Sequence, residues 1–160
     1  MTAMNRQVLL ASRPQGPVTE DNFRIVDAPI GEPGAGEVLV KNEWLSLDPY
    51  MRGRMNDVKS YVPPVRIGEV MVGQTVGEVI ESKDAQLQPG DRVLTQLGWQ
   101  LYGVVRAKDV SRIDTRRVPA SCYLGVLGMP GLTAWFGLHE IGQPKAGETV
   151  VVSAASGAVG

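Results

Sequence analysis

The stretch GEVLVKNEWLSL, residues 36–47, has the side-chain pattern that decides the fold class. Val38 and Val40 alternate with Leu39 and Lys41, so the two valines point to one face of the chain and the other pair to the opposite face. Alternation with a period of two is typical of a β-strand that packs one face on a core. The stretch therefore predicts a β-strand.

Five more short apolar runs of this kind precede residue 119. Pro89-Gly90, a turn signal, separates the run at 72–82 from the run at 91–98. Several short strands at this spacing predict a mainly β fold with the form of a small barrel or sandwich. The five runs are QVLLASRP (7–14), NFRIVDAPI (22–30), VGQTVGEVIES (72–82), DRVLTQLG (91–98) and WQLYGVVRAKDV (99–110).

A helical pattern follows over residues 131–141. Apolar or aromatic side chains recur there at the i, i+3, i+4 and i+7 spacing of one helix face. These residues are Leu132, Trp135, Phe136 and His139. We expect Trp135 and Phe136 to be core residues. Gly142 is a natural stop just past the last periodic residue.

The end of the sequence combines a continuous apolar run with a glycine pattern. TVVVSA (149–154) lacks alternation, which predicts a strand buried on both faces, as in a parallel sheet. Ala155, Gly157 and Gly160 then form A-x-G-x-x-G, a variant of the loop that brings backbone N–H groups to a pyrophosphate. A flexible glycine tail is the alternative. A phosphate-binding loop of this kind also needs the N-terminus of a following helix. We therefore expect the 160-residue chain alone to bind a dinucleotide poorly and to show no activity that depends on one.

Composition excludes several classes of protein. The net charge is -1 and the basic pairs Arg52/Arg54 and Arg116/Arg117 are local, so we predict solvated surface there and no nucleic-acid partner. No apolar run approaches the roughly 20 residues that span a bilayer, so we expect no membrane partner. The single cysteine excludes an internal disulfide framework, and the first residues do not form a signal peptide, so we expect a cytoplasmic location.

Three segments carry a resemblance to a known family: LSLDPYMRGRM (45–55), GMPGLTAWFGLHEIG (128–142) and VSAASGAVG (152–160). Together they resemble the zinc-independent branch of the medium-chain dehydrogenase/reductase superfamily. That branch includes leukotriene B4 dehydrogenase/prostaglandin reductase, plant alkenal double-bond reductases and bacterial NADPH-dependent curcumin reductase.

The resemblance implies a domain organisation. Residues 1–118 are expected to form a GroES-like β-barrel catalytic domain with short helices, and residues 119–147 a helical connection. Residues 148–160 would contain the first strand and truncated glycine loop of an NADP-binding Rossmann domain. The chain would then be the N-terminal part of a longer enzyme, whose full-length form we expect to be a homodimer.

The resemblance also implies a reaction. Family members reduce the carbon–carbon double bond of a small α,β-unsaturated ketone or aldehyde with NADPH. Hydride goes to the β-carbon, and negative charge develops on the carbonyl oxygen, where a preorganised hydrogen-bond donor lowers the barrier. Two other functions stay open: a quinone reductase that shares the A-x-G-x-x-G loop, and a non-catalytic β-barrel that binds a partner.

The residue types argue against zinc. Gln74 stands where the zinc-using relatives have a ligand histidine, and a structural site needs about four Cys, His or carboxylate ligands. His139 is the only histidine and is expected to be structural. Cys122 is expected to be a small buried apolar residue. We therefore expect no metal ligands in the chain.

The resemblance assigns candidate site residues. Tyr50 is the candidate catalytic residue and also a substrate contact, because a phenol can pack against an enone and donate to its oxygen. The alternative is a core tyrosine. Tyr61 is a second candidate substrate contact. Asp48 is expected to be a turn residue, with Arg52 as its structural partner.

The cofactor candidates lie in two places. Met129, Gly131 and Thr133 are expected at the nicotinamide end, where Gly131 would permit close backbone approach and Thr133 would offer a hydroxyl. A helix start with Thr133 exposed is an equally open interpretation. The expected phosphate contacts are Ala155, Gly157, Ala158, Val159 and Gly160.

Overall fold

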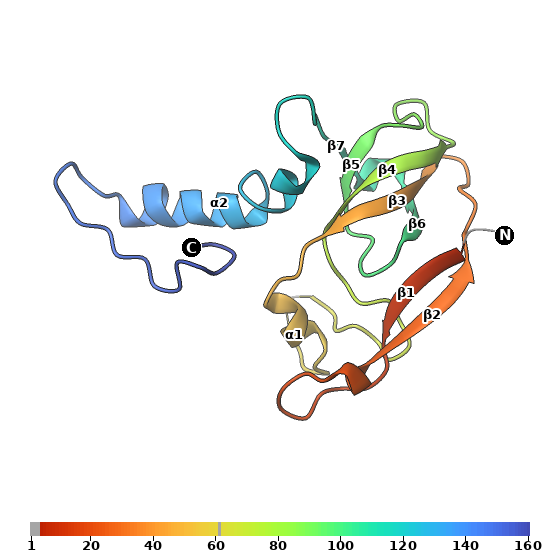
Figure 1. The fold of residues 1–160 in the computed structure, drawn as a ribbon, viewed down its shortest axis with the longest axis horizontal. Helices are drawn as coiled ribbons and strands as arrows, with labels where there is room; N and C mark the ends of the chain where they lie inside the picture. Colours follow the sequence, from red (N-terminus) through yellow and green to blue (C-terminus); the bar gives the residue numbers. More distant parts are fainter. Residues whose placement is uncertain (1–3, 61) are drawn as a thin grey trace.

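The computed structural model describes residues 4–60 and 62–160, which form a β-rich body with a helical arm (Figure 1). In the labels used here, η marks 3-10 or π-helical segments. The elements are β1 (Met4–Leu10), η1 (Glu20–Asn22), β2 (Phe23–Pro29), β3 (Glu37–Leu45), α1 (Tyr50–Arg54), β4 (Thr75–Ser82), β5 (Arg92–Thr95), β6 (Tyr102–Arg106), η2 (Ala107–Asp109), β7 (Ser111–Arg112), η3 (Ala120–Leu124), α2 (Met129–Trp135) and η4 (Phe136–Gly142).

Two antiparallel sheets form the β-rich body. β1 and β2 pair with each other, and the other five strands form a sheet in the order β6-β3-β4-β5-β7. Each of the six apolar runs contains or overlaps one of these strands, so the predicted mainly β fold is confirmed. The stretch 36–47 supplies β3, which lies between β6 and β4.

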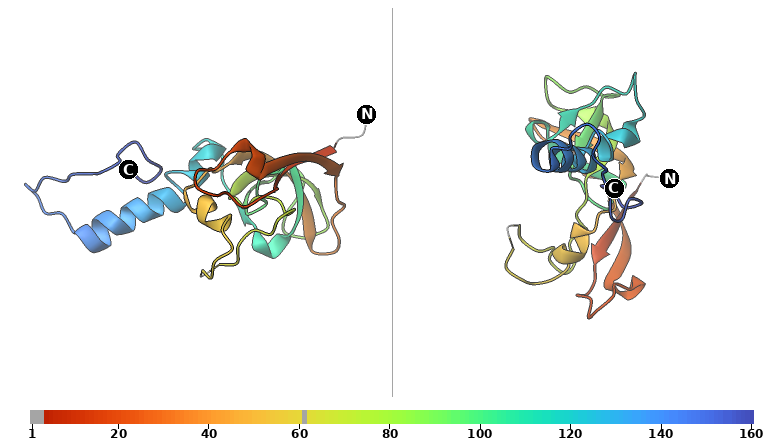
Figure 2. Two further views of the ribbon diagram at one scale, coloured as in Figure 1. Left: turned by 90° about the horizontal axis from the view of Figure 1, so that it is seen from below. Right: turned by 90° about the vertical axis from the view of Figure 1, so that its left-hand side faces the viewer.

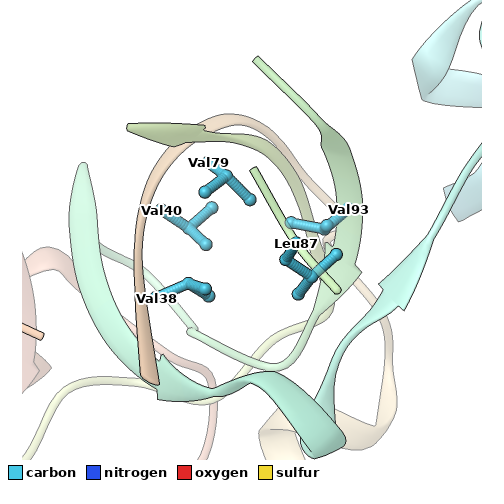
Figure 3. Packing of buried hydrophobic residues seen from close by; sticks show 5 residues of the cluster. All are labelled: Val38, Val40, Val79, Leu87 and Val93. Carbon is cyan, nitrogen blue, oxygen red and sulfur yellow. The ribbon is translucent and has the colours of Figure 1, made fainter. Parts of the chain in front are cut away.

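The five-stranded sheet curves around its core but does not close into a barrel in the described part of the chain (Figure 3). β6 and β7 are its two edges. Closure would require these edges to pair, and β7 has only two residues with which to make a ladder. The expectation of a barrel is thus corrected to an open, strongly curved sheet.

The core inside this sheet consists of valines from three neighbouring strands and one loop leucine (Figure 3). Val38 and Val40 of β3 are both 0% exposed, which confirms that the predicted alternation directs them inward. Val79 of β4 and Val93 of β5 meet them, with Leu87 beside them. Each such fully buried side chain contributes about 1.5–3 kcal/mol relative to an exposed one.

A second cluster attaches α1 to the rest of the body. Met55, at the end of α1, packs with Leu10 of β1 and with Val65 and Met71, and all four are buried. A backbone hydrogen bond also joins β1 to this cluster, because the Met71 N–H donates to the Val8 oxygen at 2.9 Å. The short helix α1 is therefore held against a packed surface.

The predicted helix of residues 131–141 is present as α2 followed by η4, and it projects from the β-rich body (Figures 1 and 2). It ends one residue later than expected, because Gln143 adopts the left-handed conformation with φ 47°. The prediction that Trp135 and Phe136 are core residues was wrong: they are 59% and 57% exposed. The described residues supply no packed surface to cover this face.

The strand predicted at 149–154 is also absent. Val150, Val151 and Val152 are 52%, 87% and 52% exposed and belong to no ladder among the described residues. A strand needs a neighbouring strand to satisfy its backbone N–H and C=O groups. High β-propensity alone does not create that partner, so this prediction fails for the chain described here.

Candidate functional site

A pocket of about 310 Å³ opens beside α1. Its walls come from the helix and from the segment that follows it, and its volume is at the lower end of the range for small-molecule sites. The lining residues are Tyr50, Gly53, Arg54, Asn56, Val58, Lys59, Ser60, Val62 and Pro64. Two of them are cationic and none is acidic.

The position of α1 follows from its sequence. Pro49 precedes the helix, and the apolar side chains of Met51 and Met55, 5% and 2% exposed, anchor it to the core. Residues four apart share a helix face, so Tyr50 and Arg54 lie together on the pocket side. The Val65 N–H donates to the Arg54 carbonyl at 2.9 Å and joins the far wall of the pocket to the helix.

Tyr50 is the first residue of α1 and is 41% exposed at the pocket wall. It is therefore no buried core tyrosine, which was the alternative interpretation. Tyr61 lies outside the described residues. Ser60 and Val62, its neighbours in sequence, both line the pocket.

Arg52 has a structural role, but not the expected one. Its guanidinium donates to Asn56 Oδ1 at 2.6 Å and to the Gly16 carbonyl at 2.8 Å. The expected pair with Asp48 does not form among the described residues, where the Arg52 side chain instead joins Asn56 and the Gly16 carbonyl. Arg52 and Arg54 are both half-buried, so the prediction of solvated surface was wrong for this pair.

The three cofactor candidates near α2 have intramolecular roles in the structure. The Thr133 hydroxyl donates to the Met129 carbonyl at 2.7 Å, so its proton is engaged within the helix. A Cβ on Gly131 would overlap the Val126 carbonyl oxygen, so the packing of the chain itself already requires glycine at this position. Met129 is 65% exposed.

The glycine loop retains donors that suit a phosphate. Ala154 has a positive φ of 51°, and the Gly157 N–H donates to its carbonyl at 2.8 Å. No backbone acceptor is found among the described residues for the N–H groups of Ala158, Val159 and Gly160. These three exposed amides lie at positions where the sequence predicts phosphate contacts.

The structure does not bring the two parts of the predicted site together within one pocket. The pocket at α1 contains Tyr50 and none of the residues predicted to bind the cofactor. It contains four polar residues that the sequence analysis missed as site residues: Arg54, Asn56, Lys59 and Ser60. The spacing of Arg54 four residues after Tyr50 in a helix was the available signal.

Within residues 4–60 and 62–160, no three His, Cys, Asp or Glu side chains cluster in a way that could hold a metal ion. The His139 ring lies 4.1 Å from the Trp135 ring, between centroids. Cys122 is half-buried rather than fully buried, which corrects the expectation for it. The described helices include none that is both long and apolar enough to cross a membrane.

The shifted pKa values belong to surface ion pairs away from the pocket. Hydrogen bonds from the Arg116 side chain, at 2.6 and 2.8 Å, hold the pKa of the Asp114 carboxyl well below its usual range. The Arg6 side chain likewise lowers the pKa of Asp27 by hydrogen bonding. Neither pair faces Tyr50, so these shifts carry no argument about catalysis.

The fold corresponds to a known class of domain. Residues 6–113 match the family described as the N-terminal domain of oxidoreductase, and the chain belongs to this family. It is 53% identical over 156 residues to the NADPH-dependent curcumin reductase of Escherichia coli (strain K12), with 98% of this chain and 45% of that protein aligned. It is 44% identical over 161 residues to the 2-alkenal reductase (NADP(+)-dependent) of Nicotiana tabacum, with 98% and 47% aligned.

A solved structure agrees with these relatives. The fold is similar to that of CurA in complex with NADPH from Vibrio vulnificus, with a TM-score of 0.89, 50% identity and coverage of 96% of this chain and 46% of that chain. The predicted resemblance to the curcumin and alkenal reductase branch is confirmed. The chain spans a little under half the length of the relatives it matches.

Proposed function

We propose that this chain supplies the substrate-binding part of an NADPH-dependent oxidoreductase that reduces the carbon–carbon double bond of α,β-unsaturated ketones and aldehydes. The observation that carries the proposal is Tyr50, whose phenol lines a pocket of about 310 Å³ on a helix anchored in the core. The relatives named for NADPH-dependent reduction of curcumin and of 2-alkenals support the same chemistry.

In this proposal bound NADPH supplies a hydride to the β-carbon of the substrate. Tyr50 would donate a hydrogen bond to the carbonyl oxygen, where negative charge develops as the hydride arrives, and a proton from solvent added to the α-carbon would complete the saturated product. A donor placed for that charge stabilises the transition state more than the ground state, and one such hydrogen bond is worth about 3 kcal/mol. The ring of Tyr50 and the apolar pocket residues Val58 and Val62 pack against the carbon skeleton.

The cofactor would be held by the chain's own amides and by α2. Ala158, Val159 and Gly160 have N–H groups that can donate to the phosphates, together with Ala155 in the same loop, while Gly157 would let the backbone approach them closely. Met129, Gly131 and Thr133 would contact the nicotinamide end. Thr133 could accept a hydrogen bond there, since its own proton is donated to Met129.

We propose that the reaction proceeds without zinc. The support is the donor set, because Gln74 occupies the place of a ligand histidine and no ligand cluster lies in the described residues. Residues 1–118 would be the catalytic domain, 119–147 the connection and 148–160 the start of the NADP-binding domain. The complete protein would be a cytoplasmic homodimer.

The proposal is tested by comparing the rate of NADPH oxidation with an enone as substrate and with a quinone as substrate. The complete protein that carries this chain is expected to oxidise NADPH with 3-penten-2-one or trans-2-hexenal and to release the saturated ketone or aldehyde. Absorbance at the NADPH maximum follows the rate, and mass spectrometry identifies the product. An allylic alcohol as the product, or turnover of 1,4-benzoquinone alone, would contradict it, the latter in favour of a quinone reductase.

The 160-residue chain alone is expected to bind NADPH weakly and to catalyse no turnover. The described residues after 142 form no helix, so the glycine loop lacks the partial positive charge of a helix N-terminus. Titration calorimetry is expected to give a Kd at least tenfold weaker than that of the complete protein. Equal affinity of the 160-residue chain and the complete protein for NADPH would overturn this expectation and the role given to an adjoining helix.

A further inference from the structure

The side of α1 that faces neither the pocket nor the core is fastened to a distant loop. Tyr50 and Arg54 line the pocket, whereas Met51 and Met55 are buried in the core. A helix turns by about 100° per residue, so a side chain two positions after Tyr50 leaves the helix on nearly the opposite side. Arg52 occupies that position and does not line the pocket.

Two arginine side chains join α1 to the loop of residues 11–19, which follows β1 and turns next to the helix (Figure 1). Arg52 of α1 donates to the Gly16 carbonyl at 2.8 Å. Arg13 of the loop donates to the Met55 carbonyl, at the end of α1, at 2.6 Å. The two hydrogen bonds run in opposite directions between the same two segments, and we call them the arginine clamp.

The arginine clamp is partly shielded from water. The Arg13 side chain is 22% exposed, and Arg52 is half-buried. A hydrogen bond from a charged donor is stronger than a neutral one, and limited access of water strengthens it further. Arg52 in addition donates to Asn56 Oδ1 at 2.6 Å, and Asn56 lines the pocket. The clamp therefore reaches from the distant loop to the pocket wall.

Resting on the proposed function, we infer that Arg13 and Arg52 position the Tyr50 hydroxyl for the reaction. Met51 and Met55 hold one side of α1 through apolar contacts, which are not directional. The clamp adds directional bonds on another side and so fixes the rotation of the helix about its axis. A rotation of about 10° would move the end of a tyrosine side chain by roughly 1.5 Å, and a misplacement of about 1 Å can cost a hundredfold in rate. Arg13 and Arg52 touch no reacting atom, so they are positioning residues.

A double-mutant cycle in the complete protein tests whether the clamp acts through Tyr50. Arg52→Gln and Arg13→Gln each remove one charged donor, and each is made in the wild-type protein and in the Tyr50→Phe background. Steady-state kinetics with trans-2-hexenal at saturating NADPH give kcat and KM for every variant. A protein that already lacks the Tyr50 hydroxyl has no positioning of that hydroxyl left to lose, so the two effects should not add.

Each clamp variant is expected to lower kcat about tenfold in the wild-type protein and less than about twofold in the Tyr50→Phe background. KM is expected to stay within about twofold, because apolar packing tolerates a small shift better than a hydrogen bond does. Arg52→Lys, which keeps a charged donor, is expected to hold kcat within about threefold of the wild-type value and carries the test if Arg52→Gln does not fold. Arg66→Gln is the matched control, since Arg66 is 84% exposed, pairs with Glu69 and lies outside the pocket.

Two results would overturn the inference and leave the proposed function intact. The first is a kcat within twofold of the wild-type value in both clamp variants. The second is an equal fold-loss of kcat in the two backgrounds, which would mean that the clamp only supports the fold. An unchanged kcat in Tyr50→Phe itself would instead contradict the catalytic role of Tyr50, and the inference would fail with it. The single variant Tyr50→Phe thus separates failure of the proposed function from failure of the clamp.

Discussion

Tyr50→Phe is expected to lower kcat for an enone by about a hundredfold in the complete protein, with little change in KM. The ring that packs against the substrate remains, so ground-state binding is preserved. Only the hydroxyl is lost, and its hydrogen bond strengthens as charge builds on the carbonyl oxygen. Steady-state kinetics at saturating NADPH measure both constants.

Tyr102→Phe is the matched control for this variant. Tyr102 begins β6, is half-buried and does not line the pocket, so removal of its hydroxyl should leave kcat unchanged. If Tyr50→Phe retains kcat within twofold of the wild-type value, Tyr50 does not stabilise the developing negative charge. A matched rise in KM with constant kcat would reassign Tyr50 to substrate binding alone.

Gly77→Ala is expected to lower the free energy of unfolding by about 3 kcal/mol or more. Gly77 lies in β4 opposite Asn42 of β3, where the two strands approach closely. A Cβ at this position would overlap the Lys41 carbonyl oxygen and lie 2.7 Å from Val40 Cγ1. The overlap is with backbone, so relief requires the β3–β4 ladder to separate in the middle of the sheet.

Urea denaturation followed by tryptophan fluorescence measures this change in the complete protein. Gly137→Ala is the control, because no heavy atom lies within 4 Å of a Cβ at that position in η4. This control should be neutral or more stable by up to about 1 kcal/mol, since alanine favours helix over glycine. A loss below about 0.5 kcal/mol in Gly77→Ala would contradict the close approach of β3 and β4.

The helical arm illustrates where sequence patterns stop being sufficient. The spacing of Leu132, Trp135 and Phe136 correctly predicted a helix, because helical periodicity is a local property of the chain. It did not predict their burial, since burial depends on which surface is available to cover them. The same limit applies to the valines of 149–154, whose pattern predicted a strand that has no partner here.

The pocket shows a second limit. The segment 45–55 indicated Tyr50 through resemblance, but not that α1 would place Arg54 beside it with its Nε shielded and unpaired. That arrangement depends on Met51 and Met55 packing into the core and on Arg52 being engaged elsewhere. Apart from the Arg52–Asn56 hydrogen bond, these contacts join residues far apart in the chain, so local spacing does not predict them.

The sequence by itself determined β1 to β6, but not the two-residue β7, and it determined the inward face of β3, because the alternation of apolar residues along a strand is a property of the sequence, as at Val38 and Val40. It also determined the family, through three specific segments. Only the tertiary structure decided that the sheet stays open, that the arm is exposed and that the Arg54 Nε has no acceptor among the described residues. Those features follow from which surfaces meet, and meeting surfaces bring together residues that the linear order keeps apart.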